Sequence, residues 1–378
     1  MSGNESPCSL YIHIPFCKKK CPYCHFTSFP DSPEARKTYL KALFCELEQY
    51  SPLLEGRPIT SIYFGGGTPF LIGPQAVSSL LEKVRAISPF DGEVTIEANP
   101  GSMDPTALCE YRVAGVNRLS LGVQSFNDHE LATLCRPHSV LNNLEAVSQA
   151  VKGGFNNISL DLMYDLPNQR VEDFEMSLQT ACSLPITHLS LYNLTIEPQT
   201  PWFRKKEAIL QQMPTSDESE AMYRKAIDTV TCAGFAQYEI SAFAKQGFHS
   251  IHNTGYWQGR EFIGLGPSAF SFWGGVRFSN TTDLAAYIDA TTNGRSPVVF
   301  QESLSAQERL REMVLVGLRM NEGIQLEILE GRYASHDAEL RTKMDRLVDG
   351  QLLSWSNGRY ALTDQGRMVY DSLAVELI

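Results

Sequence analysis

The sequence lacks a long apolar run and an excess of basic charge. No stretch of its 378 residues approaches the ~18 consecutive apolar residues of a membrane-spanning helix. The N-terminal segment MSGNESPCSLYIHIP lacks both the basic and the apolar region of a secretion signal. The formal net charge of -11 argues against a polyanion as the principal partner. We therefore expect a cytoplasmic protein with no integral membrane segment and no nucleic-acid partner.

The cysteines also lack the pattern of a secreted disulfide framework. The chain has nine of them, and Cys17, Cys21 and Cys24 crowd into one short loop while the others are scattered. An odd number with one local cluster fits a reducing compartment and a thiolate-bound metal better than paired disulfides. The spacing within this loop is therefore the first indication of chemistry.

The CxxxCxxC loop offers three thiolates for a metal cluster. Three thiolates can bind three irons of a four-iron cubane and leave the fourth iron open. The amino and carboxylate groups of S-adenosylmethionine (SAM) can chelate the open iron. An electron passed from the cluster to the sulfonium then breaks a carbon-sulfur bond. The alternative is a zinc site completed by His25 or a distant cysteine, but zinc sites commonly use CxxC pairs that recur, and no second pair exists. The sequence thus favours a [4Fe-4S] cluster on Cys17, Cys21 and Cys24, with SAM as a second cofactor.

Six β-rich runs alternate with amphipathic helical stretches along the first part of the chain. The runs lie at residues 9–15, 61–67, 93–100, 117–125, 157–167 and 187–195. Strands joined by helices of this length predict parallel pairing with right-handed crossovers. We expect an α/β protein in which residues 1–298 form a partial (β/α)6 barrel, because six units are too few for a closed barrel of eight.

The pattern changes to helices at the expected second domain, residues 299–378. Helical stretches at 303–320 and 335–350 precede a β-hairpin at 352–363, whose Asn357-Gly358 pair suits the positive φ angles of a tight turn. This combination resembles a small winged-helix-like domain. From residue 301 onward 13 acidic side chains stand against 9 basic ones, which would repel phosphate. A role in packing or protein interaction is therefore expected rather than DNA binding.

Several polar residues fall at the ends of the expected strands, where barrels of this kind carry their working groups. The GGGTP segment leaves backbone groups uncovered by side chains, so that a ligand can approach closely. Glu97, Gln124, Arg136 and Asp161 could hold ribose hydroxyls and the charged methionyl end of SAM. His252, in HNTGYW, is either a metal-ligating imidazole beside two aromatics or a structural histidine, and residue chemistry alone favours the structural role.

Taken together, the motifs resemble those of the HemN/HemW branch of radical SAM proteins from about residue 9 to the C-terminus. They are YIHIPFCKKKCPYC, GGGTP, GVQSF, DLMYDLP, YEISAFA, GLGPSAFSF and LTDQGR. The resemblance implies a radical SAM barrel with a HemN-type C-terminal domain, and cluster ligation by the three cysteines. It also implies a set of SAM-site positions: Tyr11, Tyr23, Gly66, Gly67, Thr68, Glu97, Gln124, Arg136 and Asp161.

Two functions occur in this branch, and sequence features favour one of them. Oxygen-independent coproporphyrinogen III dehydrogenases carry a fourth cysteine, CxxxCxxCxC, and a long N-terminal extension. Here the fourth position is Phe26, and ten residues precede Tyr11. The HNxxYW element is similar to one proposed to bind haem in the other subgroup, which delivers haem to client haemoproteins, and it makes His252 the expected axial ligand. We therefore expect a haem chaperone, with the dehydrogenase as the alternative and a radical enzyme for a non-tetrapyrrole substrate as a third interpretation.

Some positions depart from the usual pattern of the branch. LGRxH reads LCRPH with Cys135, DLIYGLPGQ reads DLMYDLPNQ with Asp165 and Asn168, and YEISNFA has Ala242. No departure removes an expected cluster ligand. The haem client and the electron donor stay unidentified, and a homodimer stays open.

Overall fold

The computed structural model describes residues 6–101 and 103–377, and its centre is a run of six parallel strands. The strands are hydrogen-bonded in chain order: β1 (Cys8–Ile14), β4 (Ile59–Gly66), β5 (Glu93–Ala98), β6 (Arg118–Gln124), β7 (Ile158–Tyr164) and β8 (His188–Asn193). Most residues of β1 and β5 are buried, as expected of strands covered on both faces. The predicted partial (β/α)6 arrangement is confirmed.

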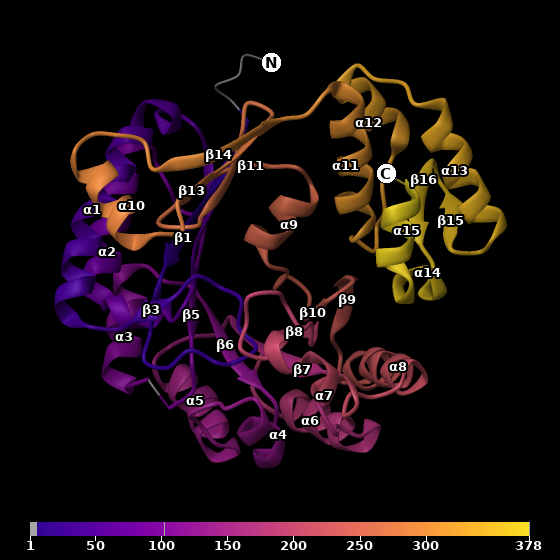
Figure 1. Cartoon of the computed structure of the whole chain (residues 1–378), viewed down its shortest axis with the longest axis horizontal. Helices are drawn as coiled ribbons and strands as arrows, with labels where there is room; N and C mark the ends of the chain where they lie inside the picture. Colours follow the sequence, from indigo (N-terminus) through magenta and orange to yellow (C-terminus); the bar gives the residue numbers. More distant parts are fainter. Residues whose placement is uncertain (1–5, 102, 378) are drawn as a thin grey trace.

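The connecting helices form an arc around the outside of the curved sheet (Figure 1). The longer ones are α1 (Pro33–Leu54), α2 (Pro74–Ile87), α3 (Pro105–Ala114), α5 (Val140–Lys152), α6 (Val171–Ser183) and α8 (Ser216–Cys232), and the short α4 (Asp128–Thr133) and α7 (Lys206–Leu210) lie between them. Local sequence fixes several helix starts. Ser139 with Asn142, and Thr215 with Glu218, form capping boxes in which each partner satisfies a free backbone N–H of the other.

The sheet continues beyond the six strands on both sides. On one side β11 (Glu261–Leu265) pairs in parallel with β1, and β12 (Phe270–Trp273), β13 (Val276–Asn280) and β14 (Val298–Ser303) follow as antiparallel strands. On the other side β10 (Ala242–Ala244) and β9 (Ala236–Glu239) follow β8. The sheet thus has 12 strands, with β14 and β9 at its edges. A separate pair, β2 (Phe16–Cys17) and β3 (Phe29–Pro30), brackets the cysteine loop.

The C-terminal part has its own hydrophobic core. It contains α11 (Ala306–Leu318), α12 (Leu326–Tyr333), α13 (Ala338–Asp349), α14 (Asp364–Met368), α15 (Tyr370–Leu377) and the hairpin of β15 (Leu353–Ser356) and β16 (Arg359–Leu362). Asn357 and Gly358 have φ values of 52° and 74° at the hairpin turn, which agrees with the sequence prediction. The expected boundary between 298 and 299 falls at the start of β14, a strand of the large sheet. We therefore propose a boundary after Ser303.

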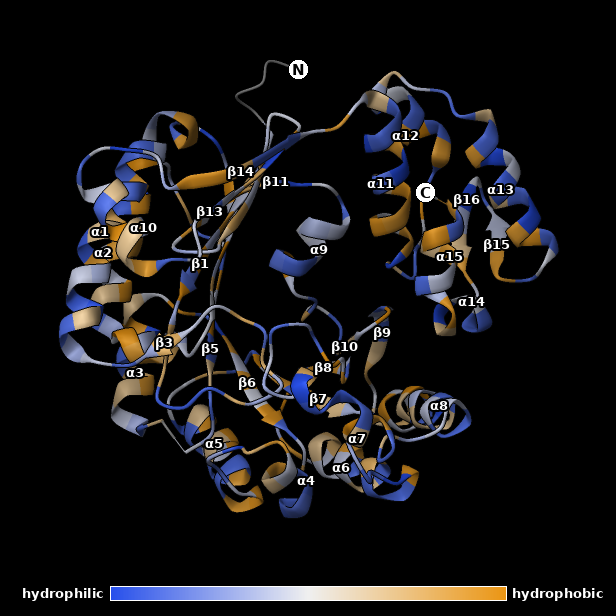
Figure 2. Cartoon of the chain, viewed as in Figure 1, coloured by the Kyte–Doolittle hydropathy of each residue, from blue (hydrophilic) through white to orange (hydrophobic). Residues whose placement is uncertain are grey.

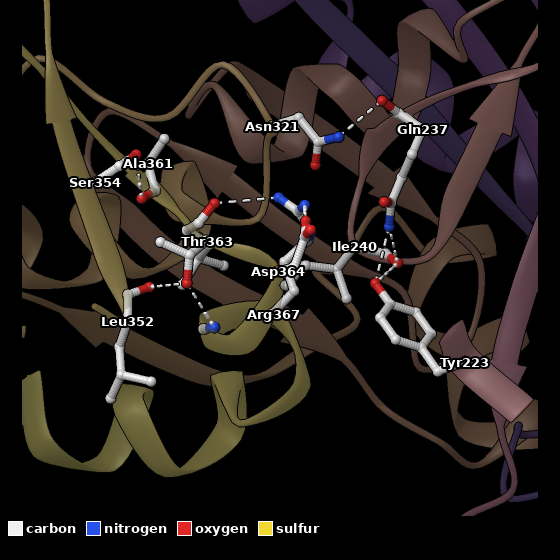
Figure 3. Close-up of polar contacts among 12 residues, drawn as sticks. Tyr223, Gln237, Ile240, Asn321, Leu352, Ser354, Ala361, Thr363, Asp364 and Arg367 are labelled. Carbon is white, nitrogen blue, oxygen red and sulfur yellow. Dashed lines mark hydrogen bonds and ion pairs between the residues drawn. The ribbon is translucent and has the colours of Figure 1, made fainter. Parts of the chain in front are cut away.

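Polar contacts join the two parts around the segment between α11 and α12 (Figure 3). Asn321 Nδ2 donates to Gln237 O at 2.8 Å, and Gln237 Nε2 donates to the hydroxyl of Tyr223 at 2.8 Å. Ile240 N donates to Arg319 O at 3.0 Å, so the segment runs alongside β9 as a short strand would. Helix α9 (Ile251–Trp257) lies between the sheet and α11 (Figure 1). The seam is therefore built from backbone pairing as well as side chains.

Hydrophilic and hydrophobic residues are mixed along the helices around the sheet (Figure 2). This mixture fits helices that bury one face and expose the other. In residues 6–101 and 103–377, no helix combines the length and apolarity needed to cross a membrane.

Candidate functional site

A cavity of about 370 Å³ lies where the parallel strands end. All the site residues expected from the sequence line it except Tyr11 and His252: Cys17, Cys21, Cys24, Tyr23, Gly66, Gly67, Thr68, Glu97, Gln124, Arg136 and Asp161. These residues come from the cysteine loop and from the ends of β4, β5, β6 and β7, or from the loops that follow. The fold thus gathers segments more than 140 residues apart around one space, as α/β folds do at the carboxyl ends of their strands.

The three cysteines of the loop are free thiols at one side of this cavity. Arg136 Nη1 donates to Cys21 Sγ at 3.5 Å, and Thr68 Oγ1 donates to Cys17 Sγ at 3.7 Å. Hydrogen bonds to sulfur of this kind are among the contacts that tune an iron-sulfur centre. Among the described residues, no three His, Cys, Asp or Glu side chains are grouped as the ligands of a single ion would be. Three thiolates on one loop suit a cluster, in which each thiolate would take its own iron.

Arg136 is held in place by residues of two neighbouring strand ends. Its Nη2 donates to Asn99 Oδ1 at 2.5 Å and to Gly122 O at 2.7 Å. A side chain at Gly122 would press on this arrangement, since a Cβ there would lie 3.3 Å from Arg136 Nη2. Arg136 Nε is buried and has no hydrogen-bond partner in the part of the chain that the structure describes. An unsatisfied buried donor of this kind can take an acceptor from a ligand.

Two carboxyl groups face the same cavity with raised pKa values. Burial, followed by the nearby Asp161, raises the pKa of Glu97 to about 7, although Tyr63 OH (2.8 Å) and Gly66 N (3.2 Å) donate to it. Burial raises the pKa of Asp161 to about 6, and Ser120 Oγ donates to this carboxyl at 3.2 Å. A cationic ligand would favour the ionised form of both groups. The pair therefore suits a molecule with an ammonium and a sulfonium, as SAM has.

Two cavity residues adopt backbone conformations that carry structural cost or require glycine. Gln124 has a φ of 70° at an irregularity in the pairing of β6 with β7, and strained non-glycine residues of this kind cluster at functional sites. Gly66 has a φ of 112°, and a Cβ there would lie 2.6 Å from the ring of His13. Glycine is therefore required at Gly66, both by the backbone conformation and by the lack of space for a side chain.

The two expected tyrosines occupy different places. Tyr23 lines the cavity, and its ring centroid lies 5.8 Å from that of Trp202. Tyr11 does not line it. Its ring lies against that of Tyr63, with centroids 6.2 Å apart, and its hydroxyl is 3.1 Å from His13 Nδ1. The Tyr11 ring also lies beside Gly65, since a Cβ there would be 2.9 Å from it. A direct contact between Tyr11 and SAM remains a prediction.

His252 is buried away from the cavity, and both of its ring nitrogens have partners. Nδ1 lies 3.0 Å from Ser61 Oγ, Nε2 lies 2.7 Å from Tyr256 OH, and the ring stacks on Tyr63 with centroids 5.0 Å apart. The side chain is 1% exposed, and burial lowers its pKa to about 3. No ring nitrogen is free in this conformation, and an axial haem ligand at His252 stays a prediction. The structural histidine, the alternative interpretation of the sequence, describes what is found.

Three of the four positions that depart from the usual pattern share a backbone feature, the exception being Ala242 on β10. Cys135, Asp165 and Asn168 have φ values of 53°, 58° and 59°, in the left-handed region that favours glycine. None of them lines the cavity. The Asp165 carboxylate accepts from Ser219 Oγ at 2.6 Å and from the cavity-lining Asn193.

Sequence reasoning missed other residues around the cavity. Asn99 ties Arg136 to Thr68, donating to Thr68 Oγ1 at 3.0 Å, and its place two residues after Glu97 was the available signal. Further lining residues come from the cysteine loop, from β7, and from the end of β8 and the loop after it: Lys19, Lys20, His25, Phe26, Met163, Tyr192, Asn193, Leu194, Thr195 and Glu197. The loop residues adjoin the cysteines, whereas nothing in the β8 sequence marked its end as part of the site.

Comparison with known proteins agrees with this geometry. Residues 11–181 match the Radical SAM superfamily, and residues 304–369 match the HemN C-terminal domain. The chain is 34% identical over 379 residues to Heme chaperone HemW of Escherichia coli, with 97% of each protein covered. It is 33% identical over 367 residues to Heme chaperone HemW of Bacillus subtilis, with 96% of each covered.

A mitochondrial relative and a solved structure extend the comparison. The chain is 35% identical over 371 residues to Radical S-adenosyl methionine domain-containing protein 1, mitochondrial, of Danio rerio, covering 94% of this chain and 82% of that protein. The structure of coproporphyrinogen III oxidase (HemN) from Escherichia coli superposes with a TM-score of 0.84 over 98% of this chain and 90% of that chain, at 24% identity, which shows the shared fold. The chain belongs to the HemN/HemW branch of the radical SAM superfamily.

Proposed function

We propose that this protein binds haem and passes it to client haemoproteins, and that it carries a [4Fe-4S] cluster and SAM. The observation that carries the proposal is the similarity, at 33–34% identity and over nearly the whole length, to proteins named heme chaperones. The similarity to the oxidase rests on the fold. Phe26 supports the same choice, because it stands where the dehydrogenases carry a fourth cysteine and it lines the cavity.

The residues around the cavity suit the two expected cofactors. Cys17, Cys21 and Cys24 would hold the cluster, with Thr68 and Arg136 donating to two of the sulfurs. When bound, the cluster would supply the electron for any cleavage of SAM at its sulfonium. Further residues would bind and orient SAM: Glu97 and Asp161 through their carboxylates, Gln124 and Arg136 as hydrogen-bond partners, Tyr23 by ring contact, and Gly66, Gly67 and Thr68 by leaving their backbone accessible.

The test combines haem binding, haem transfer and turnover in one preparation. The full chain is reconstituted anaerobically, titrated with haem, mixed with apomyoglobin as a surrogate acceptor, and assayed separately with coproporphyrinogen III. We expect stable haem binding, transfer to apomyoglobin and no turnover to protoporphyrinogen. Turnover without stable haem binding would contradict the chaperone function and favour the dehydrogenase. Absence of both would favour a radical enzyme for another substrate.

The role of His252 is tested against a matched histidine. His188 is likewise buried, with Ser159 Oγ 2.8 Å from its Nδ1 and Tyr238 OH 2.9 Å from its Nε2. If His252 is structural, His252→Ala and His188→Ala lower the free energy of unfolding by similar amounts, about 1–3 kcal/mol, and the folded variants keep the haem spectrum. Loss of the haem spectrum in His252→Ala alone would identify His252 as the axial ligand of the haem iron.

The proposal extends to three features of the protein in the cell. It includes a cytoplasmic location, an electron donor for the cluster and, as an open point, a homodimer. The Danio rerio relative is described as mitochondrial, so location has to be measured by fractionation. Sedimentation of the reconstituted chain with and without haem determines the oligomeric state.

A further inference from the structure

We propose that His25 supplies the axial nitrogen to the iron of bound haem, and that the haem lies at the mouth of the SAM cavity. This inference rests on the proposed function, since it names the place where the haem is held. It concerns a residue next to Cys24 that lines the cavity and that the mechanism above does not use.

The environments of the other histidines argue against them as iron ligands. The chain has eight histidines. His13, His188 and His252 are buried and have a hydrogen-bond partner at each ring nitrogen. His138 is buried as well. Its Nε2 lies 3.3 Å from Val123 O, and its Nδ1 has no partner among the described residues. Burial therefore keeps all four rings from a macrocycle in this conformation, whether or not each nitrogen has a partner.

The remaining three exposed histidines lie away from the cavity. His129 is on α4, His249 stacks on Tyr238 with centroids 4.1 Å apart, and His336 lies 3.0 Å from a carboxylate oxygen of Glu330. None of them lines the 370 Å³ cavity. His25 differs from all seven, because it is exposed, lines the cavity and makes no hydrogen bond with another residue that the structure describes.

The surroundings of His25 match the chemistry of haem, a flat apolar ring with two carboxylates at one edge. Phe26 is 52% exposed, and its ring centroid lies 4.6 Å from that of His25, so it offers an apolar face beside the iron ligand. Lys19 and Lys20 line the same mouth and are exposed. Their ammonium groups suit the two propionates, and this local positive charge stands out in a chain with a net charge of -11.

The loop that carries these groups is partly fixed before any ligand arrives. Lys20 Nζ donates to Phe26 O at 2.8 Å, which ties the two sides of the cysteine loop together. Cys24 N donates to Cys21 O at 3.2 Å within the same turn. Tyr192, 45% exposed, also lines the cavity from the end of β8. Haem held at this mouth would cover the opening of the SAM cavity, so bound haem should slow the exchange of SAM.

The experiment compares His25→Ala with His129→Ala, an exposed histidine away from the cavity. Both full-length variants are reconstituted anaerobically and titrated with ferric haem, and the Soret band and the low-spin electron paramagnetic resonance signal are recorded. We expect His25→Ala to bind haem at least about tenfold more weakly and to lose the histidine-type spectrum, with recovery on addition of imidazole. His129→Ala should behave as the wild type. The iron and sulfide content of each variant reports whether the cluster loop is intact.

A second variant tests the propionate contacts without touching the iron ligand. Lys19→Glu should weaken binding of haem about tenfold and leave binding of haem dimethyl ester, which lacks the carboxylates, unchanged. Equal effects on both compounds would overturn the placement at this mouth. If His25→Ala loses its cluster, the Lys19→Glu variant still tests whether haem lies at the mouth of the cavity.

The outcomes separate this inference from the proposed function. A wild type that binds haem, together with a His25→Ala variant that keeps the same affinity and spectrum, overturns the role of His25 and leaves the chaperone function standing. An altered cluster spectrum with intact haem binding assigns His25 to the cluster instead. A wild type that binds no haem overturns both.

Discussion

Single positions with a left-handed backbone show how side chains compensate for strain in this chain. Cys135 and Asp165 have nearly the same φ, 53° and 58°. Cys135 is exposed, and its only side-chain hydrogen bond in the described part of the chain is a 3.9 Å contact from Sγ to Thr133 O. Asp165 is buried and receives hydrogen bonds from Ser219 and Asn193. Side-chain hydrogen bonds thus support the left-handed conformation at Asp165, whereas Cys135 has almost no such support.

Replacement of each residue by glycine should therefore have opposite effects. Cys135→Gly relieves the strain of the left-handed conformation and should raise the free energy of unfolding by up to about 1 kcal/mol, after the entropy that glycine adds to the unfolded chain. Asp165→Gly relieves similar strain but strands two donors, so it should cost about 1–2 kcal/mol. Urea unfolding measures both values. Changes of the same sign would contradict the explanation.

Helix α9 is the element that connects the large sheet to the C-terminal part. The guanidinium of Arg319 lies 4.4 Å from the ring centroid of Trp257 on α9 and 5.6 Å from that of Tyr370 on α15. Its Nη2 also lies 3.4 Å from a carboxylate oxygen of Glu239 on β9. One side chain therefore contacts three elements that are far apart in the sequence, so α9, β9 and α15 depend on it for their relative placement.

Loss of the Arg319 contacts should destabilise the junction between the large sheet and the C-terminal part. Arg319→Met keeps much of the side-chain volume but leaves the buried Glu239 without its cation, and it should lower the free energy of unfolding by about 2–4 kcal/mol. Arg332→Met is the control, since Arg332 also reaches across the seam but makes one exposed contact, to Gln258 O at 3.4 Å. It should cost less than about 0.5 kcal/mol. Equal losses in thermal and urea unfolding would show that Arg319 has no special role.

At the scale of the whole molecule, one buried carboxyl joins the barrel to the antiparallel extension of the sheet. Glu46 on α1 is fully buried and accepts from Gly266 N at 2.8 Å, Asn280 Nδ2 at 2.5 Å and Tyr287 OH at 2.6 Å. These partners lie after β11, at the end of β13 and on α10 (Leu284–Thr292). Burial raises its pKa to about 7 in spite of the three donors.

This raised pKa predicts how stability depends on pH. Because the folded protein keeps a proton that the unfolded chain loses near pH 4.5, the contribution of Glu46 declines as pH rises through about 7, by about 3 kcal/mol. Glu46→Gln removes this titration, so the difference in unfolding free energy between wild type and variant should shift by that amount between about pH 4.5 and pH 8. Glu48→Gln, exposed on the same helix, should leave the pH profile unchanged. An unchanged profile in Glu46→Gln would contradict the raised pKa.

Much of the fold was readable from the sequence because its signals are local. The alternation of buried strands and amphipathic helices predicted six βα units, and Asn357-Gly358 predicted a hairpin, since only a few residue types adopt its positive φ angles readily. The strands β11 to β14 were missed. They are short and begin immediately after loops, so their pairing depends on partners far along the chain.

The sequence by itself determined the chemistry that the site can offer. The spacing of Cys17, Cys21 and Cys24 depends on one loop, and the residues at strand ends share one edge because parallel strands all point the same way. The tertiary structure alone decided which side chains are accessible. It buried His252 between Ser61 and Tyr256 and left His25 exposed at the cavity mouth. Burial and hydrogen-bond partners arise from packing between distant segments, and no local pattern in a sequence encodes them.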